Sequence, residues 1–285
     1  MIISVASGKG GTGKTLISTS LAMSAGENAQ IIDCDVEEPN AHIFIKPEII
    51  KKKDVFIPVP EVHEKKCTFC GKCQEICEYK SIAVIPEKEN TSGQVLIFEE
   101  LCHGCGACSY LCPEGAIKEK QREVGIIEFG NAGDLEFVGG KMNIGEAMAP
   151  PVIREVKKNI DSVKTVIIDA PPGTTCPTVT SIQNSDYCIL VTEPTPFGLN
   201  DLMLAVDVLK EIKIPFGVVV NRFDLGDKKT DEYCQKEGIE VLFRIPFSRE
   251  IAECYSKGIP LVDCKEEYRI YFRDLIETVK ERVKT

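Results

Sequence analysis

The sequence lacks the features that take a protein into or across a membrane. It contains no apolar run long enough to span a bilayer, and no basic start followed by an apolar segment. It is also poor in positive charge, because 34 Lys and Arg against 44 Asp and Glu leave a formal net charge of −10. Proteins that bind nucleic acid generally neutralise phosphates with clustered basic side chains, and the one like-charge run, Lys51–Lys53, is expected to be a solvated loop. We expect a cytoplasmic protein and expect neither nucleic acid nor a membrane as its partner.

Cysteine is the residue type that the sequence has in excess. The 285 residues are 43% hydrophobic, enough to bury a sizeable core, and they include 14 cysteines. Disulfides are disfavoured in the cytoplasm, so a count this high indicates metal or cluster ligation.

A phosphate-binding loop is predicted near the start of the chain. Residues 7–15 read Ser-Gly-Lys-Gly-Gly-Thr-Gly-Lys-Thr, between a strand-like apolar opening and a helix-like stretch at 16–25. Backbone N–H groups around the four glycines and the following helix terminus can bind phosphate oxygens. Lys14 is expected to reach the β- and γ-phosphates, and Thr15 to offer its hydroxyl to Mg²⁺. The alternative is a glycine-rich turn that binds nothing. The nucleotide-binding residues predicted here are Gly8, Gly10, Gly11, Thr12, Gly13, Lys14 and Thr15.

A second lysine, Lys9, distinguishes this loop from most phosphate-binding loops. Ser-x-Lys-Gly-Gly-x-Gly-Lys-Thr resembles the deviant Walker A motif of the superfamily of MinD, ParA, Mrp and the nitrogenase iron protein. The resemblance implies an ATP-dependent homodimer in which Lys9 reaches the nucleotide of the partner subunit. The alternative is a solvated lysine on a loop.

Further motifs resemble the same superfamily in their order along the chain. Residues 169–174, Asp-Ala-Pro-Pro-Gly-Thr, resemble its Mrp-like Walker B and switch II run. The resemblance implies that Asp169 and Asp33 support Mg²⁺ and that Asp35 orients the attacking water, so that Lys9, Lys14 and Asp35 form the catalytic set. It also implies adenine contacts from Asn221, Arg222 and Pro246, and a γ-phosphate contact from the N–H of Gly173.

Eight cysteines form two matching runs, which repeat at an offset of 35 residues (67 to 102). The first run is Cys67, Cys70, Cys73 and Cys77, and the second is Cys102, Cys105, Cys108 and Cys112. The runs resemble the bacterial ferredoxin with two [4Fe–4S] clusters, in which the last cysteine of each run ligates the other cluster. The resemblance implies Cys67, Cys70, Cys73 and Cys112 for cluster 1, and Cys102, Cys105, Cys108 and Cys77 for cluster 2. A pair of zinc sites is the alternative. Glu78 stands where proline usually follows the first run.

The order of the segments predicts an α/β fold, a doubly wound, mostly parallel sheet with an inserted small α+β ferredoxin domain. Strand cores are expected at 30–33, 166–168, 188–191, 218–220 and 241–245, with helices between them, for example at 199–212 and 231–237. We expect the ATPase in two parts, residues 1–61 and 121–285, and the ferredoxin domain at 62–120. A hairpin is expected around Asn90-Thr91-Ser92-Gly93, and an amphipathic, packed helix at 268–283.

The remaining cysteines give weaker signals. Cys34, Cys188, Cys234, Cys254 and Cys264 lie in apolar or amphipathic stretches and are expected to pack as small hydrophobes. Cys176 lies seven residues after Asp169, where the nitrogenase iron protein carries a cluster cysteine. Either a packed thiol or a ligand of a cluster shared between subunits fits that position.

Together these features favour a dimeric, Mg²⁺-dependent ATPase whose nucleotide state controls an iron–sulfur module. Its task is either ATP-gated electron delivery or assembly of an iron–sulfur centre or metallocentre, on an unidentified redox or metalloprotein partner. A MinD- or ParA-like positioning ATPase without a redox role is the alternative, and a plain electron carrier with an inactive ATPase is a third.

Overall fold

The computed structural model describes residues 1–88 and 92–284 and divides into two compact units. The first unit comprises Met1–Lys53, Ile126–Lys141 and Ala149–Thr285, and the second comprises Asp54–Gly125 and Met142–Met148. The segment expected to be the ferredoxin insertion, 62–120, lies within the second unit, which extends beyond it at both ends. Its assignment as a ferredoxin domain stays a prediction.

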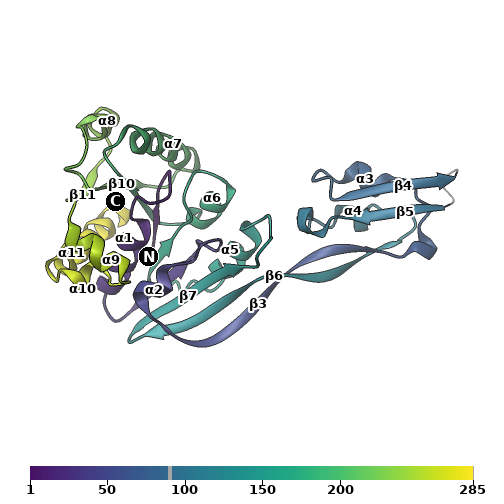
Figure 1. Cartoon of the computed structure of the whole chain (residues 1–285), viewed down its shortest axis with the longest axis horizontal. Coiled ribbons are helices and arrows are strands. Elements are labelled where there is room, and N and C mark those ends of the chain that lie inside the picture. Colours follow the sequence, from purple (N-terminus) through teal and green to yellow (C-terminus); the bar gives the residue numbers. More distant parts are fainter. Residues whose placement is uncertain (89–91, 285) are drawn as a thin grey trace. The chain divides into compact units, whose positions relative to one another are not determined.

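A nine-stranded sheet runs in the order β11-β10-β9-β1-β8-β2-β7-β6-β3. Figure 1 labels β11, β10, β7, β6 and β3 of this sheet. All strand pairs from β11 to β7 are parallel. The predicted mostly parallel α/β fold is therefore confirmed, and every predicted strand core lies in one of these strands. The parallel strands are β1 (Ile2–Ala6), β2 (Ala29–Asp33), β7 (Leu135–Met142), β8 (Thr165–Asp169), β9 (Tyr187–Thr192), β10 (Phe216–Asn221) and β11 (Val241–Ile245).

Helices cover both faces of these strands, because successive side chains point to opposite faces. Ile189 and Val191 of β9 pack into one core with α1, α9, α10 and α11, whereas Cys188 and Leu190 pack into the other with α6, α7 and α8. The helices of this unit are α1 (Lys14–Ser24), α2 (Ala41–Ile45), α5 (Pro150–Lys157), α6 (Cys176–Ile182), α7 (Pro196–Ile212), α8 (Lys229–Glu237), α9 (Arg249–Ser256), α10 (Leu261–Cys264) and α11 (Glu267–Lys284).

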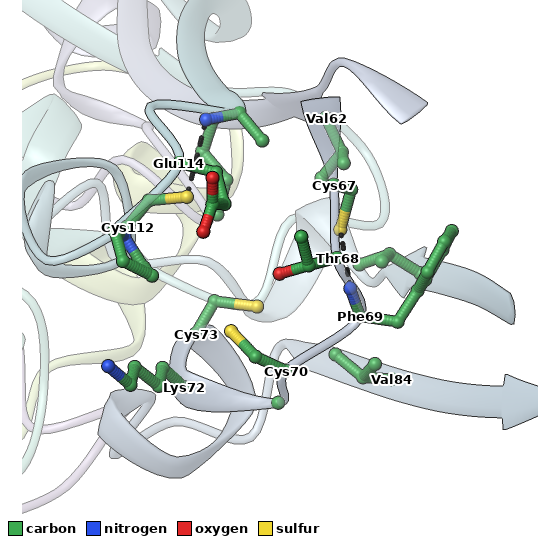
Figure 2. A pocket seen from close by; sticks show the side chains of 15 residues that line it. Val62, Cys67, Thr68, Phe69, Cys70, Lys72, Cys73, Val84, Cys112 and Glu114 are labelled. Carbon is green, nitrogen blue, oxygen red and sulfur yellow. Dashed lines mark hydrogen bonds between the residues drawn. The ribbon is translucent and has the colours of Figure 1, made fainter. Parts of the chain in front are cut away.

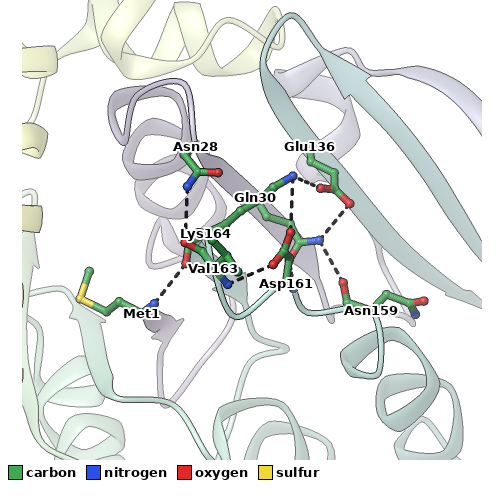
Figure 3. Close-up of polar contacts among 8 residues, drawn as sticks. All are labelled: Met1, Asn28, Gln30, Glu136, Asn159, Asp161, Val163 and Lys164. Carbon is green, nitrogen blue, oxygen red and sulfur yellow. Dashed lines mark hydrogen bonds and ion pairs between the residues drawn. The ribbon is translucent and has the colours of Figure 1, made fainter.

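A polar network joins β2 and β7 to the loop before β8, at the end of the sheet opposite the strand carboxyl ends (Figure 3). Gln30 of β2 is fully buried, and its side chain donates to Glu136 and to the Asn159 carbonyl, while accepting from the Asp161 N–H. Glu136 also pairs with Lys164. Because the Gln30 amide has partners on both its nitrogen and its oxygen, its burial costs little.

The far edge of the sheet was not predicted. β6 (Ile117–Ala132) and β7 are neighbours joined by two residues, so they form an antiparallel hairpin, and β3 (Glu48–Val62) is the edge strand. The expectation of a solvated loop at Lys51–Lys53 is wrong, because these residues lie in β3. Lys52 pairs with Glu128 at 2.6 Å, and Lys53 with Glu155 at 3.6 Å. Lysines are common on edge strands because they discourage pairing with other chains.

The second unit contains the predicted hairpin. β4 (Ile82–Lys88) and β5 (Ser92–Ile97) pair in antiparallel fashion, with Ile82 opposite Ile97. Asn90 and Thr91 of the expected turn lie outside the described residues. A short 3₁₀ turn precedes each cysteine run and a short helix lies within it: η1 (Glu64–Lys66) and α3 (Lys72–Ile76) for the first run, and η2 (Glu99–Leu101) and α4 (Ala107–Tyr110) for the second.

The last helix, α11, packs against the sheet as expected. Phe272 and Val279 have no exposed surface, and α11 contacts α1. In the part of the chain that the structure describes, no helix has the length and hydropathy to cross a membrane.

The expectation for the isolated cysteines is correct for three and wrong for two. Cys34, Cys188 and Cys234 are buried, but Cys254 and Cys264 form a disulfide that joins the end of α9 to the end of α10. The sequence pattern predicts that Cys254 and Cys264 lie in amphipathic segments, but it does not predict that they lie next to each other.

Candidate functional site

The predicted nucleotide-binding residues come together at the carboxyl ends of the central strands, where open α/β sheets bind ligands. β1 lies between β8 and β9, so the loop that follows it opens beside the end of β8. Asp169, the last residue of β8, is in register with Val5 of β1 and with Asp33 of β2. The loop and the carboxylates of Asp33 and Asp169 therefore lie together at the carboxyl end of the sheet.

Two glycines give the phosphate-binding loop its shape. Gly11 and Gly13 have φ values of 80° and 97°, and Gly13 directly precedes α1. A Cβ on Gly13 would lie 2.6 Å from Nδ2 of Asn221, and one on Gly8 would lie 2.1 Å from the Asp201 carbonyl oxygen. The loop therefore needs glycine for its backbone conformation at positions 11 and 13, and for close packing at positions 8 and 13.

Lys14 and Thr15 are buried beside Asp169, whose setting suits a bound cation. Asp169 has no exposed surface, and neither carboxylate oxygen makes a full hydrogen bond. Burial raises the pKa of Asp169 to about 6, against the opposing effect of Lys14 and the hydroxyls of Thr15 and Ser18. A Mg²⁺ ion with its waters would satisfy these orphaned oxygens, so the residues present fit the predicted ion.

Asp33 and Asp35 have different surroundings. The two Asp33 oxygens accept the backbone N–H groups of Asp35 and Ala41, each at 3.1 Å. Burial and the charge of Asp169 raise the pKa of Asp33 well above its ordinary range. Burial also raises the pKa of Asp35 to about 6, although Lys14 opposes it. Asp33 therefore fixes the loop after β2, while the Asp35 carboxyl faces the nucleotide pocket.

That pocket encloses about 1130 Å³, its open mouth included, and is lined by both charged and apolar residues. Of the predicted adenine contacts, Asn221, Arg222 and Pro246 all line it. The Asn221 amide is largely engaged, since it donates to the Thr12 carbonyl (2.9 Å) and accepts from the Arg222 N–H (3.0 Å). Asn221 thus also supports the phosphate-binding loop from behind.

Lys9 and Gly173 have partners within their own chain. Lys9 Nζ lies 3.6 Å from Glu193 Oε2, and the Gly173 N–H donates to the Ser7 carbonyl at 2.9 Å. Neither residue lines the nucleotide pocket, so their predicted nucleotide contacts would require both to leave these partners.

The second unit repeats its backbone conformation at the sequence offset of 35 residues (67 to 102). Three left-handed positions recur: Phe69 with Gly104, Gly71 with Gly106, and Lys80 with Gly115. The turn after each run also repeats, because the Ser81 N–H donates to Cys77 Sγ and the Ala116 N–H donates to Cys112 Sγ, each at 3.3 Å. The duplicated sequence thus folds as two equivalent halves.

Each predicted set of four cysteines lines one cavity. Cys67, Cys70, Cys73 and Cys112 point their sulfur atoms into the first (Figure 2). The second is lined by Cys77, Cys102, Cys105 and Cys108. Each cavity encloses about 380 Å³, open solvent included. Every cavity therefore receives three thiols from one run and the fourth from the other.

The thiols surround these cavities and do not meet at a point. Within residues 1–88 and 92–284, no group of three or more His, Cys, Asp or Glu side chains is close enough to hold a single metal ion. A four-iron cube binds its thiolates at four separate corners, so thiols spaced around a cavity fit such a group. Burial raises the pKa of the equivalent thiols Cys73 and Cys108, to about 11 for Cys108. Cys70 and Cys105, also equivalent, are exposed.

Several residues at these sites were not predicted from the sequence. Glu38, Asn40 and Tyr255 line the nucleotide pocket, and Tyr255 packs against Phe44 with ring centroids 4.9 Å apart. Their positions follow from chain segments that meet only in the fold. Cys176 is an exposed free thiol at the start of α6.

Comparisons with known proteins agree with this geometry. A family model described as the CobQ/CobB/MinD/ParA nucleotide binding domain matches residues 3–261. An uncharacterized protein of Methanocaldococcus jannaschii is 33% identical over 263 residues, covering 90% of each chain. An iron-sulfur cluster carrier protein of Pyrococcus abyssi is 24% identical, over 91% of this chain and 78% of its own. The MinD protein of Pyrococcus horikoshii, solved with Mg-ADP, aligns with a TM-score of 0.60 at 20% identity, over 98% of this chain and 95% of its own. This last likeness shows the fold.

Proposed function

This chain belongs to the CobQ/CobB/MinD/ParA family of nucleotide-binding domains, and on that basis we propose that it is a Mg²⁺-dependent ATPase carrying two [4Fe–4S] clusters. Its ATP-dependent homodimer would couple nucleotide state to electron transfer, or to assembly of an iron–sulfur centre or metallocentre, on a partner protein. The carrier protein of Pyrococcus abyssi supports the iron–sulfur part by its similarity over most of both chains.

One observation supports the cluster assignment most directly. The two cavities of the second unit each contain one complete predicted ligand set, with the fourth thiol exchanged between the runs. Sequence spacing does not determine this exchange, and a single run cannot supply it. When bound, the clusters would provide one-electron transfer, and the exposed Cys70 and Cys105 would bring each cluster near solvent and a partner.

The ATPase part follows from the charges around the loop. Phosphoryl transfer depends mainly on positioning and on neutralising charge. Lys14 would bind the β- and γ-phosphates, Thr15 and Asp169 would hold Mg²⁺ and its waters, and Asp35 would orient the attacking water. Lys9 would come from the partner subunit. Asp33 would act indirectly, by fixing the segment that carries Asp35.

Electron transfer is favoured over assembly within this proposal. Four thiols lie around each cavity, so each cluster would be fully ligated, whereas a scaffold that hands on its cluster needs labile ligation. Anaerobic capture of bound proteins, with and without ATP, would show whether the partner is a redox enzyme or an immature metalloprotein.

Iron and acid-labile sulfide analysis of protein made anaerobically tests the cluster assignment. We expect about eight of each per chain, four for each cluster, and an electron paramagnetic resonance signal after reduction. Cys112→Ser and Cys77→Ser should each perturb one cluster, and Cys188→Ser, at a buried position outside both cavities, is the matched control. One zinc ion per run and no reducible iron would refute the assignment.

A further inference from the structure

Lys9 is held on its own chain by a buried carboxylate. Its Nζ lies 3.6 Å from Glu193 Oε2, and the Glu193 side chain is only 12% exposed, whereas that of Lys9 is 30% exposed. Arg222 donates to the other Glu193 oxygen at 2.6 Å. One carboxylate therefore binds both the lysine of the loop and an arginine at the end of β10.

The backbone that carries Glu193 is tightly fixed. The Thr195 N–H donates to the Glu193 carbonyl at 2.8 Å, and the Thr192 hydroxyl donates to the Gly198 carbonyl at 3.0 Å. Pro194 packs so closely on Gly226 that a Cβ there would lie 1.6 Å from the Pro194 oxygen. Because this backbone and the bond from Arg222 restrain the carboxylate, we expect Lys9 to be the member of the pair that moves.

Arg222 makes the release of Lys9 feasible. A buried carboxylate that loses its only cation is strongly destabilising. Glu193 would keep the Arg222 guanidinium after Lys9 departs, so its charge would stay paired. The Arg222 N–H is itself fixed to Asn221, which supports the phosphate-binding loop at Thr12.

We propose that Glu193 is a positioning residue that holds Lys9 on its own chain and so opposes dimerisation until ATP is bound. The inference rests on the proposed function, in which Lys9 binds the nucleotide of a second copy of this chain. Each dimer would then break two Lys9–Glu193 pairs, one in each subunit. Strengthening or weakening this pair would set the ATP occupancy at which dimers form.

Sedimentation velocity with a non-hydrolysable ATP analogue and Mg²⁺ tests this inference. Glu193→Gln removes the charge that holds Lys9 but keeps an oxygen for Arg222. The dissociation constant of the dimer should fall about tenfold, because each dimer breaks two partly exposed ion pairs and each such pair contributes about threefold. Nucleotide affinity of the monomer and the thermal midpoint should stay near the parent values. The matched control is Glu237→Gln. It removes a surface ion pair in which Lys210 Nζ lies 2.9 Å from Glu237 Oε2.

Testing Glu193→Gln in the Lys9→Ala variant distinguishes failure of this inference from failure of the proposed function. In Lys9→Ala, Glu193→Gln should have no effect on dimerisation, since there is no lysine to hold. If Lys9→Ala alone forms dimers as tightly as the parent, the proposed role of Lys9 in dimerisation fails. If Lys9→Ala loses the dimer but Glu193→Gln leaves dimerisation unchanged or weaker, only the present inference is overturned. Should Glu193→Gln not fold, Glu193→Asp shortens the reach to Lys9 and should shift dimerisation in the same direction.

Discussion

Among single residues, Asp169 has a charge that depends on pH close to neutrality. Its pKa of about 6 lies above the ordinary 3.8 because burial disfavours the ionised form. A raised carboxyl pKa gives stability that is present below pH about 4 and is lost as pH rises through about 6. Without Mg²⁺ and nucleotide, the advantage in unfolding free energy of Asp169→Asn over the parent should therefore grow by about 1 kcal/mol between pH 5 and pH 7. Urea unfolding at a series of pH values measures it.

The same experiment has an internal control. Asp274→Asn, at an exposed position of α11, should give no such pH-dependent gain. With Mg²⁺ and ATP the order should reverse, because Asp169→Asn loses the charge that holds the ion. An advantage of Asp169→Asn that is the same at every pH would contradict the assignment of this carboxyl.

Two lysines of one loop should fail in different ways. Lys14→Ala should lose tight nucleotide binding, because Lys14 is buried in the pocket among the carboxylates. Lys9→Ala should keep nucleotide binding but lose hydrolysis and ATP-dependent dimerisation. Isothermal titration and phosphate release separate the two effects. Hydrolysis by Lys9→Ala at the parent rate would remove the argument for a shared catalytic site.

Local sequence motifs predict most residues of the candidate site, but they do not predict the carboxylate of Glu193 that pairs with Lys9. Lys14, Thr15 and Asp169 stand in short patterns that can be read from the sequence. Glu193 has no such pattern, because its partners Lys9 and Arg222 come from the ends of two other strands. Only the order of the strands brings these three residues together.

Among elements, α9 and α10 are joined by the Cys254–Cys264 disulfide, which closes a loop of sequence separation 10. A cross-link over a loop this short lowers the conformational entropy of the unfolded chain and so raises the free energy of unfolding by about 2–3 kcal/mol. Cys254→Ser should lower the unfolding free energy by a comparable amount. A strong reductant should destabilise the parent but leave Cys254→Ser unchanged, as calorimetry with and without reductant would show. Equal response of both proteins to the reductant would contradict this.

The sequence predicts the strands that helices cover on both faces, but it does not predict the strand at the open edge of the sheet. β8 and β9 are continuous apolar runs because helices bury both of their faces. β3 begins with seven exposed residues, three of them lysines, and shows no alternation of apolar and polar residues there. Its pairing depends on the length and register of β6, which no local pattern specifies.

For the whole molecule, nucleotide state and cluster potential should depend on each other. The segment from Asp33 through Asp35 leads through α2 to β3, whose residues Asp54–Val62 belong to the unit that carries the cysteine runs. Any effect of ATP on reduction must be matched by an effect of reduction on ATP affinity. A coupling of ~1.4 kcal/mol would shift a one-electron potential by ~60 mV and ATP affinity about tenfold.

Potentiometric titrations without nucleotide, with ADP and with a non-hydrolysable ATP analogue measure this coupling. The Lys14→Ala protein, which should not bind nucleotide tightly, serves as the control and should give one potential in all conditions. Equal potentials in the parent under all three conditions would mean that the second unit does not respond to the nucleotide.

The exchange of Cys77 and Cys112 between the two cavities also has a consequence for how the protein matures. Neither half of the duplicated segment contains a complete ligand set, so neither half can be loaded while the other is unfolded. Iron insertion into either cavity should consequently require that both halves are already folded.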